Sequence, residues 1–338
     1  MPQHVPGLRM AVAVAALIAA LGVAVPAVAA TAPAQVFAPN PVADLGIQTL
    51  TDQKDADYFS ADPVLRRAYH RVTLTDLTSP AALSGAYVTV KSATGPAAAN
   101  TGAGFIFTRD QDQFEQVMAY YWITQAQRYI QSLGFGSTLP AVNRRQVPVR
   151  INQFGGDNAF FRDTKTDITF GKGGVDDAED AEVIVHEYGH SVQDAQVAGF
   201  GTTADAGAIG EGFSDYLAVS VSAAVAPTPD PACVADWDST SYTSTTPHCI
   251  RRLDTTKTVA NRTGEVHADG EIWSRALWDI RSALGARQAD TIIVRAQFGF
   301  TPGISMPAAA AQTIATAGLY GRTAQRAVTA AFAARGLA

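Results

Sequence analysis

The sequence predicts an α+β fold in which a small mixed sheet precedes a mainly helical C-terminal part. Short β-prone runs separated by Gly and Asp occupy residues 146–151, 158–161 and 167–170, and such runs are typical of strands. Patterns of helical periodicity dominate from residue 177 onwards. Because strand-like and helical stretches are segregated along the chain, we expect a sheet lying above one helix and a helical part beyond it, with a cleft between them.

The first 30 residues have the organisation of an export signal. Arg9 is their only Lys or Arg, residues 10–25 are apolar or small without interruption, and Pro26 precedes a Val-Ala-Ala sequence that ends at Ala30. This order is typical of a signal peptide, so we expect cleavage after Ala30 or one residue earlier and a secreted, extracellular protein. An uncleaved membrane anchor is the alternative, because the apolar run is near the short end of what spans a bilayer.

Composition argues against some partners. Removal of residues 1–30 takes away Arg9 and no acid, which leaves 24 basic against 31 acidic side chains and a net charge of −7. An acidic protein is a poor match for nucleic acid. Since no other segment is long and apolar enough to cross a bilayer, we expect no stable membrane association after signal cleavage.

The chain has two cysteines, Cys233 and Cys249, in a polar loop. In an exported protein this favours a disulfide bond between them. Zinc ligation is the alternative, although neither cysteine belongs to a C-x-x-C pair.

Residues 31–104 combine a Pro/Ala-rich linker with a short β segment. Residues 31–48 are rich in Pro and Ala, and we expect them to be disordered. Residues 71–74 and 86–90 alternate apolar and polar side chains as strands do, and 92–104 form a Ser, Gly and Pro-rich loop. The region is either a pro-segment or an edge of the mature domain.

Helices are predicted at four places before the C-terminal stretches. The first runs from Asp110, as its N-cap, to Gly134, and the second spans 177–198 with acids in its first turns, where the helix dipole favours them. Two more cover 208–226 and 270–284, and three Ala-rich helical stretches follow.

The most informative motif is the pentapeptide His186-Glu187-Tyr188-Gly189-His190. On a helix, positions i and i+4 project from one face, so His186 and His190 can offer two imidazole nitrogens to one metal ion. This spacing indicates a zinc-hydrolase site. Glu187 would then take a proton from the attacking water and pass it to the leaving amine.

Two acids on the next helix complete the pattern. Glu211, between glycines in Gly-Glu-Gly-Phe-Ser-Asp, is the best candidate for a third ligand, since catalytic zinc commonly has three protein ligands and one open position. Asp215 lies four residues later and could accept a hydrogen bond from the free ring nitrogen of a ligand histidine. Alternatively, both acids only solvate a helix face.

His267 stands just before the predicted helix 270–284. It could donate a hydrogen bond to the oxyanion that forms when water attacks a carbonyl. A capping or packing histidine is the alternative. His70 and His248 have no ligand pattern around them, and we expect them on the surface.

In their order, these motifs resemble a zinc metallopeptidase of the fungalysin type and, more distantly, thermolysin. The resemblance covers about residues 105–338 and implies a thermolysin-like, two-lobed α+β fold, with a catalytic N-terminal lobe (105–200) and a helical C-terminal lobe (201–338) that carries the third zinc ligand. It implies one catalytic Zn²⁺ and the following roles: zinc ligands His186, His190 and Glu211; general base Glu187; oxyanion donor His267; a partner of the ligands, Asp215; and sheet-edge contacts to the substrate backbone from Asn158 and Ala159.

The chain also departs from the thermolysin pattern. The carboxylate that orients the oxyanion histidine falls at Arg262 here, and no tyrosine is recognised as a second oxyanion donor. Calcium is a further expectation, because Glu182 matches a calcium-binding acidic position of thermolysin and three other acids lie nearby, although the helix dipole explains these acids nearly as well: Asp176, Asp177 and Asp180.

We therefore expect a secreted zinc endopeptidase that acts on protein or peptide substrates. An aminopeptidase on the same scaffold is one alternative, although the Gly-x-Met-Glu-Asn exopeptidase motif is not seen. A secreted, catalytically silent metal-binding protein is another, motivated by the unassigned second oxyanion donor and by the short segment ahead of Arg109 in place of a long propeptide.

Overall fold

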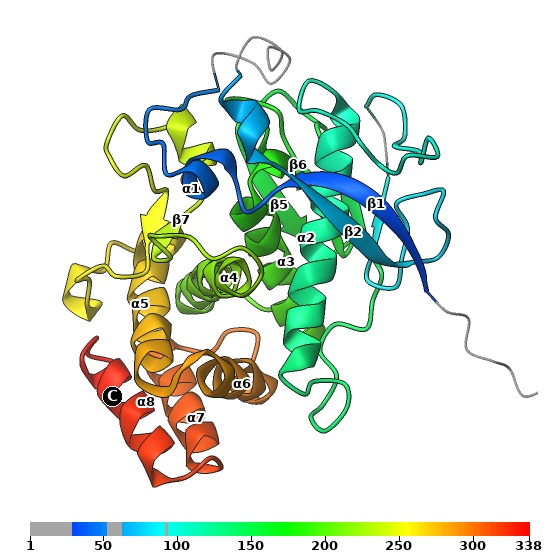
Figure 1. Cartoon of the computed structure of the whole chain (residues 1–338). Helices are drawn as coiled ribbons and strands as arrows, with labels where there is room; N and C mark the ends of the chain where they lie inside the picture. The colour runs from blue at the N-terminus through cyan, green and yellow to red at the C-terminus, as the bar shows by residue number, and fades with distance from the viewer. Residues whose placement is uncertain (1–28, 53–62, 92–93) are drawn as a thin grey trace, which may run out of the picture.

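The computed structural model describes residues 29–52, 63–91 and 94–338 (Figure 1). The predicted export signal lies almost entirely outside these residues. None of the described helices combines the length and the hydropathy that crossing a bilayer requires.

A mixed four-stranded sheet forms where strands were predicted. Its order is β3 (Val88–Val90), β4 (Val147–Arg150), β6 (Asp167–Phe170) and β5 (Ala159–Arg162). Strands β3, β4 and β6 are parallel, and β5 pairs antiparallel with β6. The short runs between Gly and Asp therefore are strands, and β5 is an edge of the sheet.

Strand β1 (Ala30–Phe37) contradicts the prediction of disorder for residues 31–48. It pairs antiparallel with β2 (Tyr69–Leu77), and Asn40 then caps the short helix α1 (Pro41–Leu45). Ala34, Val36 and Phe37 are fully buried. The prediction was wrong because it was based on the Pro and Ala content alone. The order of the residues, with small apolar side chains in alternation, fits a half-buried strand.

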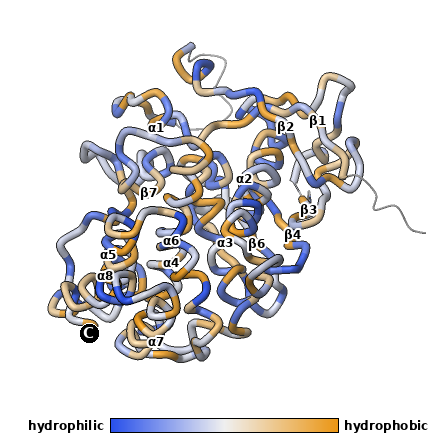
Figure 2. Tube along the Cα trace, turned by 60° about the horizontal axis from the view of Figure 1, so that its bottom comes forward, coloured by the Kyte–Doolittle hydropathy of each residue, from blue (hydrophilic) through white to orange (hydrophobic). Residues whose placement is uncertain are grey.

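The helices follow in the predicted order: α2 (Asp112–Ser132), α3 (Ala181–Gln196), α4 (Ala204–Val225), α5 (Val266–Leu284), α6 (Ala286–Ala296), α7 (Met306–Gly318) and α8 (Arg322–Ala333). Figure 1 shows α5 to α8 gathered on one side of α4, while β1 and β2 lie across α2 on the other side. The hydrophobic colour runs through the centre of the molecule around α3 and α4 (Figure 2). The α+β class is confirmed.

Several helix starts differ from the predicted ones. Asp110 does not cap α2, whose N-cap is Gln111; the Asp110 carboxylate instead accepts a hydrogen bond from the Thr108 hydroxyl. Asp177–Glu179 form a separate 3-10 turn, η3, so α3 starts at Ala181 with Asp180 as its cap. Helix α4 starts at Ala204, four residues before the predicted start, with Thr203 as its cap. Helix α5 also starts four residues early, so that His267 lies inside its first turn.

Helix α4 packs between α3 and α5, and glycines set the spacing. A Cβ at Gly189 would lie 2.8 Å from Ser214 Cα, and one at Gly212 would lie 2.3 Å from the Gly270 carbonyl oxygen. Real Cβ atoms do not approach other atoms so closely, so neither position has room for a side chain. These contacts bring Glu211 on α4 against the motif helix α3.

A buried ion pair ties the loop before α2 to η3. Arg109 is 2% exposed and Glu179 is 0% exposed. The Arg109 Nε donates to both carboxylate oxygens of Glu179 at 2.9 Å, and its Nη2 contacts Asp52. Trp237 Nε1 donates to Glu179 at 3.2 Å. The Arg109 guanidinium therefore pairs with two buried carboxyl groups inside the molecule.

The predicted disulfide between Cys233 and Cys249 is present. It joins the segment of β7 (Cys233–Val234) to the chain just before β8 (Arg251–Arg252), with which β7 pairs. This loop carries Arg251 toward the predicted site. His248, which we expected on the surface, is buried, with its Nε2 2.7 Å from the Gln48 carbonyl oxygen.

Candidate active site

His186, His190 and Glu211 converge on one point. The Nε2 atoms of the two histidines are 3.3 Å apart. The Glu211 Oε2 lies 3.2 Å from His186 Nε2, and its Oε1 lies 3.5 Å from His190 Nε2. Helix α3 supplies both imidazoles from one face, and the close approach of α4 supplies the carboxylate.

The donor set fits a zinc ion. The His186 Nδ1 donates to Asp215 Oδ1 at 2.8 Å, so its Nε2 presents a lone pair to the other two groups. The two Nε2 atoms and the Glu211 carboxylate lie 3.2–3.5 Å from one another, so all three can offer lone pairs to one cation. Two histidines and one glutamate form a ligand set found in catalytic zinc sites.

Asp215 is held from two sides. It is almost fully buried, and Arg251 donates to it through Nε at 2.6 Å and Nη2 at 2.7 Å. Burial opposes ionisation of Asp215, but Arg251 and His186 hold its pKa well below its usual range. The charged carboxylate therefore fixes the tautomer and the orientation of the His186 ring. No sequence pattern indicated Arg251, which comes from a distant loop.

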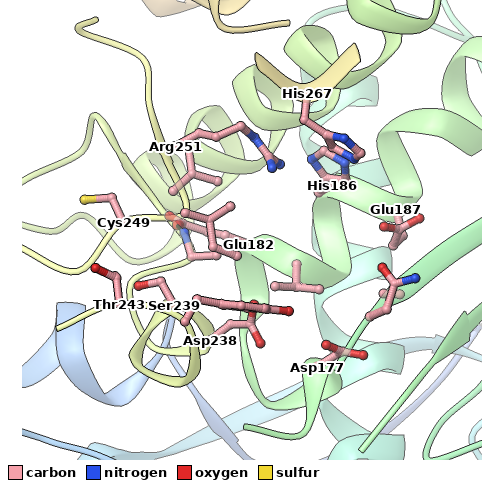
Figure 3. Close-up of a pocket in the computed structure, with 17 residues that line it drawn as sticks. Asp177, Glu182, His186, Glu187, Asp238, Ser239, Thr243, Cys249, Arg251 and His267 are labelled. Carbon is pink, nitrogen blue, oxygen red and sulfur yellow. Dashed lines mark hydrogen bonds between the residues drawn. The ribbon is translucent and has the colours of Figure 1, made fainter. Parts of the chain in front are cut away.

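Glu187 lies beside His186 on α3 and faces the same cleft (Figure 3). Its side chain is buried, and its Oε2 has no hydrogen-bond partner. Burial raises the pKa of Glu187 to about 7. A carboxyl group with a free buried oxygen and a pKa near neutrality is suited to exchange a proton with a reactant.

His267 approaches the same point from α5. Its Nε2 lies 3.4 Å from Glu211 Oε2, and its side chain is 53% exposed. Its Nδ1 lies 2.6 Å from Glu265 Oε1. Glu265 also caps α5 by accepting from the Ala268 amide at 2.7 Å. Glu265, which was not among the predicted site residues, thus contacts the His267 ring, while Arg262 pairs with Asp205 and Asp269.

Two cavities extend from this site in different directions. One, of about 420 Å³, continues toward Asp177, Asp238 and Tyr242. The other, of about 400 Å³, continues toward aromatic residues of β5 and the loop after α3: Phe160, Phe161 and Phe200. Five residues line both cavities: Asn158, Ala159, His186, Glu187 and His267. They are the two halves of one cleft with the site at its middle.

Asn158 and Ala159 lie where a substrate backbone could pass. Ala159 starts β5 and pairs with Phe170 of β6 on one side. On its other side, within the described part of the chain, β5 has no strand neighbour. A sheet edge that borders a cleft can add an extended peptide as one more strand.

Comparison with known families agrees with this arrangement. A sequence model of the fungalysin metallopeptidase family (M36) matches residues 99–296, which is more than half of the chain and includes all the site residues described above. The chain belongs to the fungalysin metallopeptidase family. A comparison with curated proteins found no match.

Membership confirms the function class that the motifs predicted. Fungalysins are zinc metallopeptidases, so this protein is a hydrolase that acts on proteins or peptides. The match begins within the Gly-rich loop that follows β3 and ends at the last residue of α6. It thus spans α2, the sheet from β4 onwards and the three helices α3, α4 and α5 that form the site.

Proposed function

We propose that this fungalysin is a secreted zinc endopeptidase in which His186, His190 and Glu211 hold the metal. The convergence of two imidazole nitrogens and one carboxylate from α3 and α4 carries the proposal. The export-type sequence at the N-terminus motivates secretion. The two cavities on either side of Glu187 favour cleavage inside a chain, because a substrate can continue in both directions.

In this proposal, each group of the site has its own role in hydrolysis. Bound zinc would supply a Lewis acid that makes a water molecule more acidic and polarises the substrate carbonyl. Glu187 accepts the proton of the attacking water on its carboxylate and returns it to the leaving amine nitrogen. His267, oriented by Glu265, donates from Nε2 to the oxyanion. Asn158 and Ala159 hold the substrate main chain at the edge of β5.

Digestion of a blocked peptide library by zinc-loaded protein tests this function. N-acetylated and C-amidated peptides should be cut at internal bonds, a metal chelator should abolish cleavage, and added zinc should restore it. If the blocked peptides stay intact and only peptides with free N-termini lose their first residue, the protein is an aminopeptidase and the proposal is wrong. One tightly bound zinc ion without any hydrolysis would indicate the silent binding protein.

The Asp215→Asn substitution should weaken metal binding. An asparagine cannot supply the negative charge that orients His186 and increases its basicity, so zinc affinity should fall about 10–100-fold. Competition with a chromophoric chelator measures the change. Asp254→Asn, at a half-exposed carboxylate that pairs with Arg252, is the matched control and should leave zinc affinity as it is. Equal affinities of the two variants would argue against the role of Asp215.

Two expectations stay as predictions. The first is a calcium ion near α3. Two of the acids that motivated it already accept hydrogen bonds: Asp180 accepts from the Glu182 amide, and Glu182 accepts from the Ala235 amide. Removal of residues 31–104 as a pro-segment is the other, and N-terminal sequencing of the secreted form would test it.

A further inference from the structure

One half of the cleft has an acidic end. Figure 3 shows Asp177 and Asp238 at the side of the cavity opposite His267. They are only 1% and 2% exposed. Asp177 belongs to η3 just before the motif helix, and Asp238 starts the 3-10 turn η4 (Asp238–Ser241) in the loop closed by the disulfide. Two segments far apart in sequence thus aim carboxylates into one space.

Within the part of the chain that the structure describes, the carboxyl groups of Asp177 and Asp238 belong to no ion pair. Arg251, the one Arg among the described residues that line this cavity, is bound through two nitrogens to Asp215. The Asp238 Oδ1 is buried without a hydrogen-bond partner. Asp177 accepts a hydrogen bond from the Gly171 amide at 2.8 Å.

A third carboxyl group, that of Asp157, lies beside these two. Oxygens of Asp157, Asp177 and Asp238 lie within 4.8 Å of one another, and the Tyr242 hydroxyl donates to Asp157 at 2.6 Å. Burial raises the pKa of Asp177 to about 8, and burial together with the neighbouring acids raises the pKa of Asp238 well above its usual range. A cation that enters this space would favour the ionised form of these carboxyl groups and would pair with them.

The walls indicate which cation fits. The same cavity is also lined by apolar side chains that include Val183, Val234 and Ile250. Lysine and arginine side chains lay their methylene stems along apolar surface and place the charge at the tip. A bare metal ion would have no use for such walls.

We propose that this cavity binds the side chain of a lysine or arginine next to the scissile bond, with Asp238 and Asp177 as the carboxylates that pair with its charge. This inference rests on the proposed function, because the cavity opens beside Glu187. The preferred substrates would then be peptides with a lysine or arginine next to the cleaved bond. Asp238, with its free buried oxygen, is the main specificity-determining residue.

Matched blocked peptides measure the preference. One series carries arginine, lysine, glutamine or norleucine at a single position on either side of one cleavable bond. The zinc-loaded protein should cleave the arginine or lysine peptide with kcat/KM at least tenfold above that of the norleucine peptide. In the Asp238→Asn variant this ratio should fall at least tenfold. Asp230→Asn removes an exposed carboxylate of the same loop and should keep the ratio of the parent protein.

A binding measurement separates the pocket from catalysis. Fluorescence polarisation of the same peptides on the zinc-loaded Glu187→Gln variant, with and without Asp238→Asn, should show the same order of affinities. If Asp238→Asn does not fold by circular dichroism, Asp177→Asn takes its place.

The outcomes are distinct. Asp238-dependent tight binding of the arginine peptide without hydrolysis by the parent protein would sustain the pocket and overturn the proposed function. Hydrolysis that favours norleucine, or a basic preference that both variants retain, would overturn the pocket. Asp238-dependent binding of calcium or terbium without a basic preference would show a metal site instead and would also overturn it.

Discussion

The Glu187→Gln substitution is expected to lower kcat about 10²–10⁴-fold, which is the range that general acid–base catalysis contributes. Glutamine has nearly the shape of glutamate but cannot accept and return a proton. Because Glu187 makes none of the contacts that join His186, His190 and Glu211, the variant should keep its metal.

Zinc content by atomic absorption and kcat on a blocked peptide test both halves of this expectation. Asp110→Asn, at an exposed carboxylate outside the cleft, removes the same charge and should change neither quantity. Full activity of the Glu187→Gln protein would remove Glu187 as the general base, whereas loss of zinc together with activity would place it in the ligand set.

Arg109→Met is expected to cost about 3–5 kcal/mol of the free energy of unfolding, the range observed when one partner of a buried ion pair is removed. The substitution leaves the buried carboxyl groups of Glu179 and Asp52 without the guanidinium that pairs with them. Methionine keeps most of the volume, so the loss reports charge rather than packing.

Urea unfolding followed by circular dichroism gives this value. Arg128→Met is the matched control, since Arg128 is 49% exposed and its pair with Asp76 lies at the surface, where such pairs contribute at most about 1 kcal/mol. If the two variants lose the same free energy of unfolding, the buried Arg109 ion pair contributes no more to stability than a surface pair does.

The elements that the sequence predicted well are those set by local patterns. The helical period places α2 to α5 to within a few residues, and the four-residue spacing of His186 and His190 puts both on one face of α3. Helix starts were less accurate because caps compete over short distances. Asp110 has the composition of a cap, yet its carboxylate accepts from Thr108, and the helix begins two residues later.

Features that depend on distant parts of the chain could not be predicted. Arg251 reaches Asp215 from a loop placed by the disulfide, and Asp238 meets Asp177 across 60 residues of sequence. Glu265 is different, because a carboxylate two residues before a histidine at a helix start can both cap the helix and orient the ring. This local pattern can be recognised in the sequence. It was missed because the orienting carboxylate was expected at position 262, which is an arginine in this chain.

Strand β1 has a practical consequence for anyone who produces this protein. It begins at Ala30, the residue at which we expect export processing to cut, and it inserts Val36 and Phe37 fully into the interior against α2. Each such side chain left out would forfeit about 1.5–3 kcal/mol of burial. Recombinant chains should therefore include the whole segment from Thr31 onwards, and a chain that starts at Leu50 should be insoluble or poorly folded.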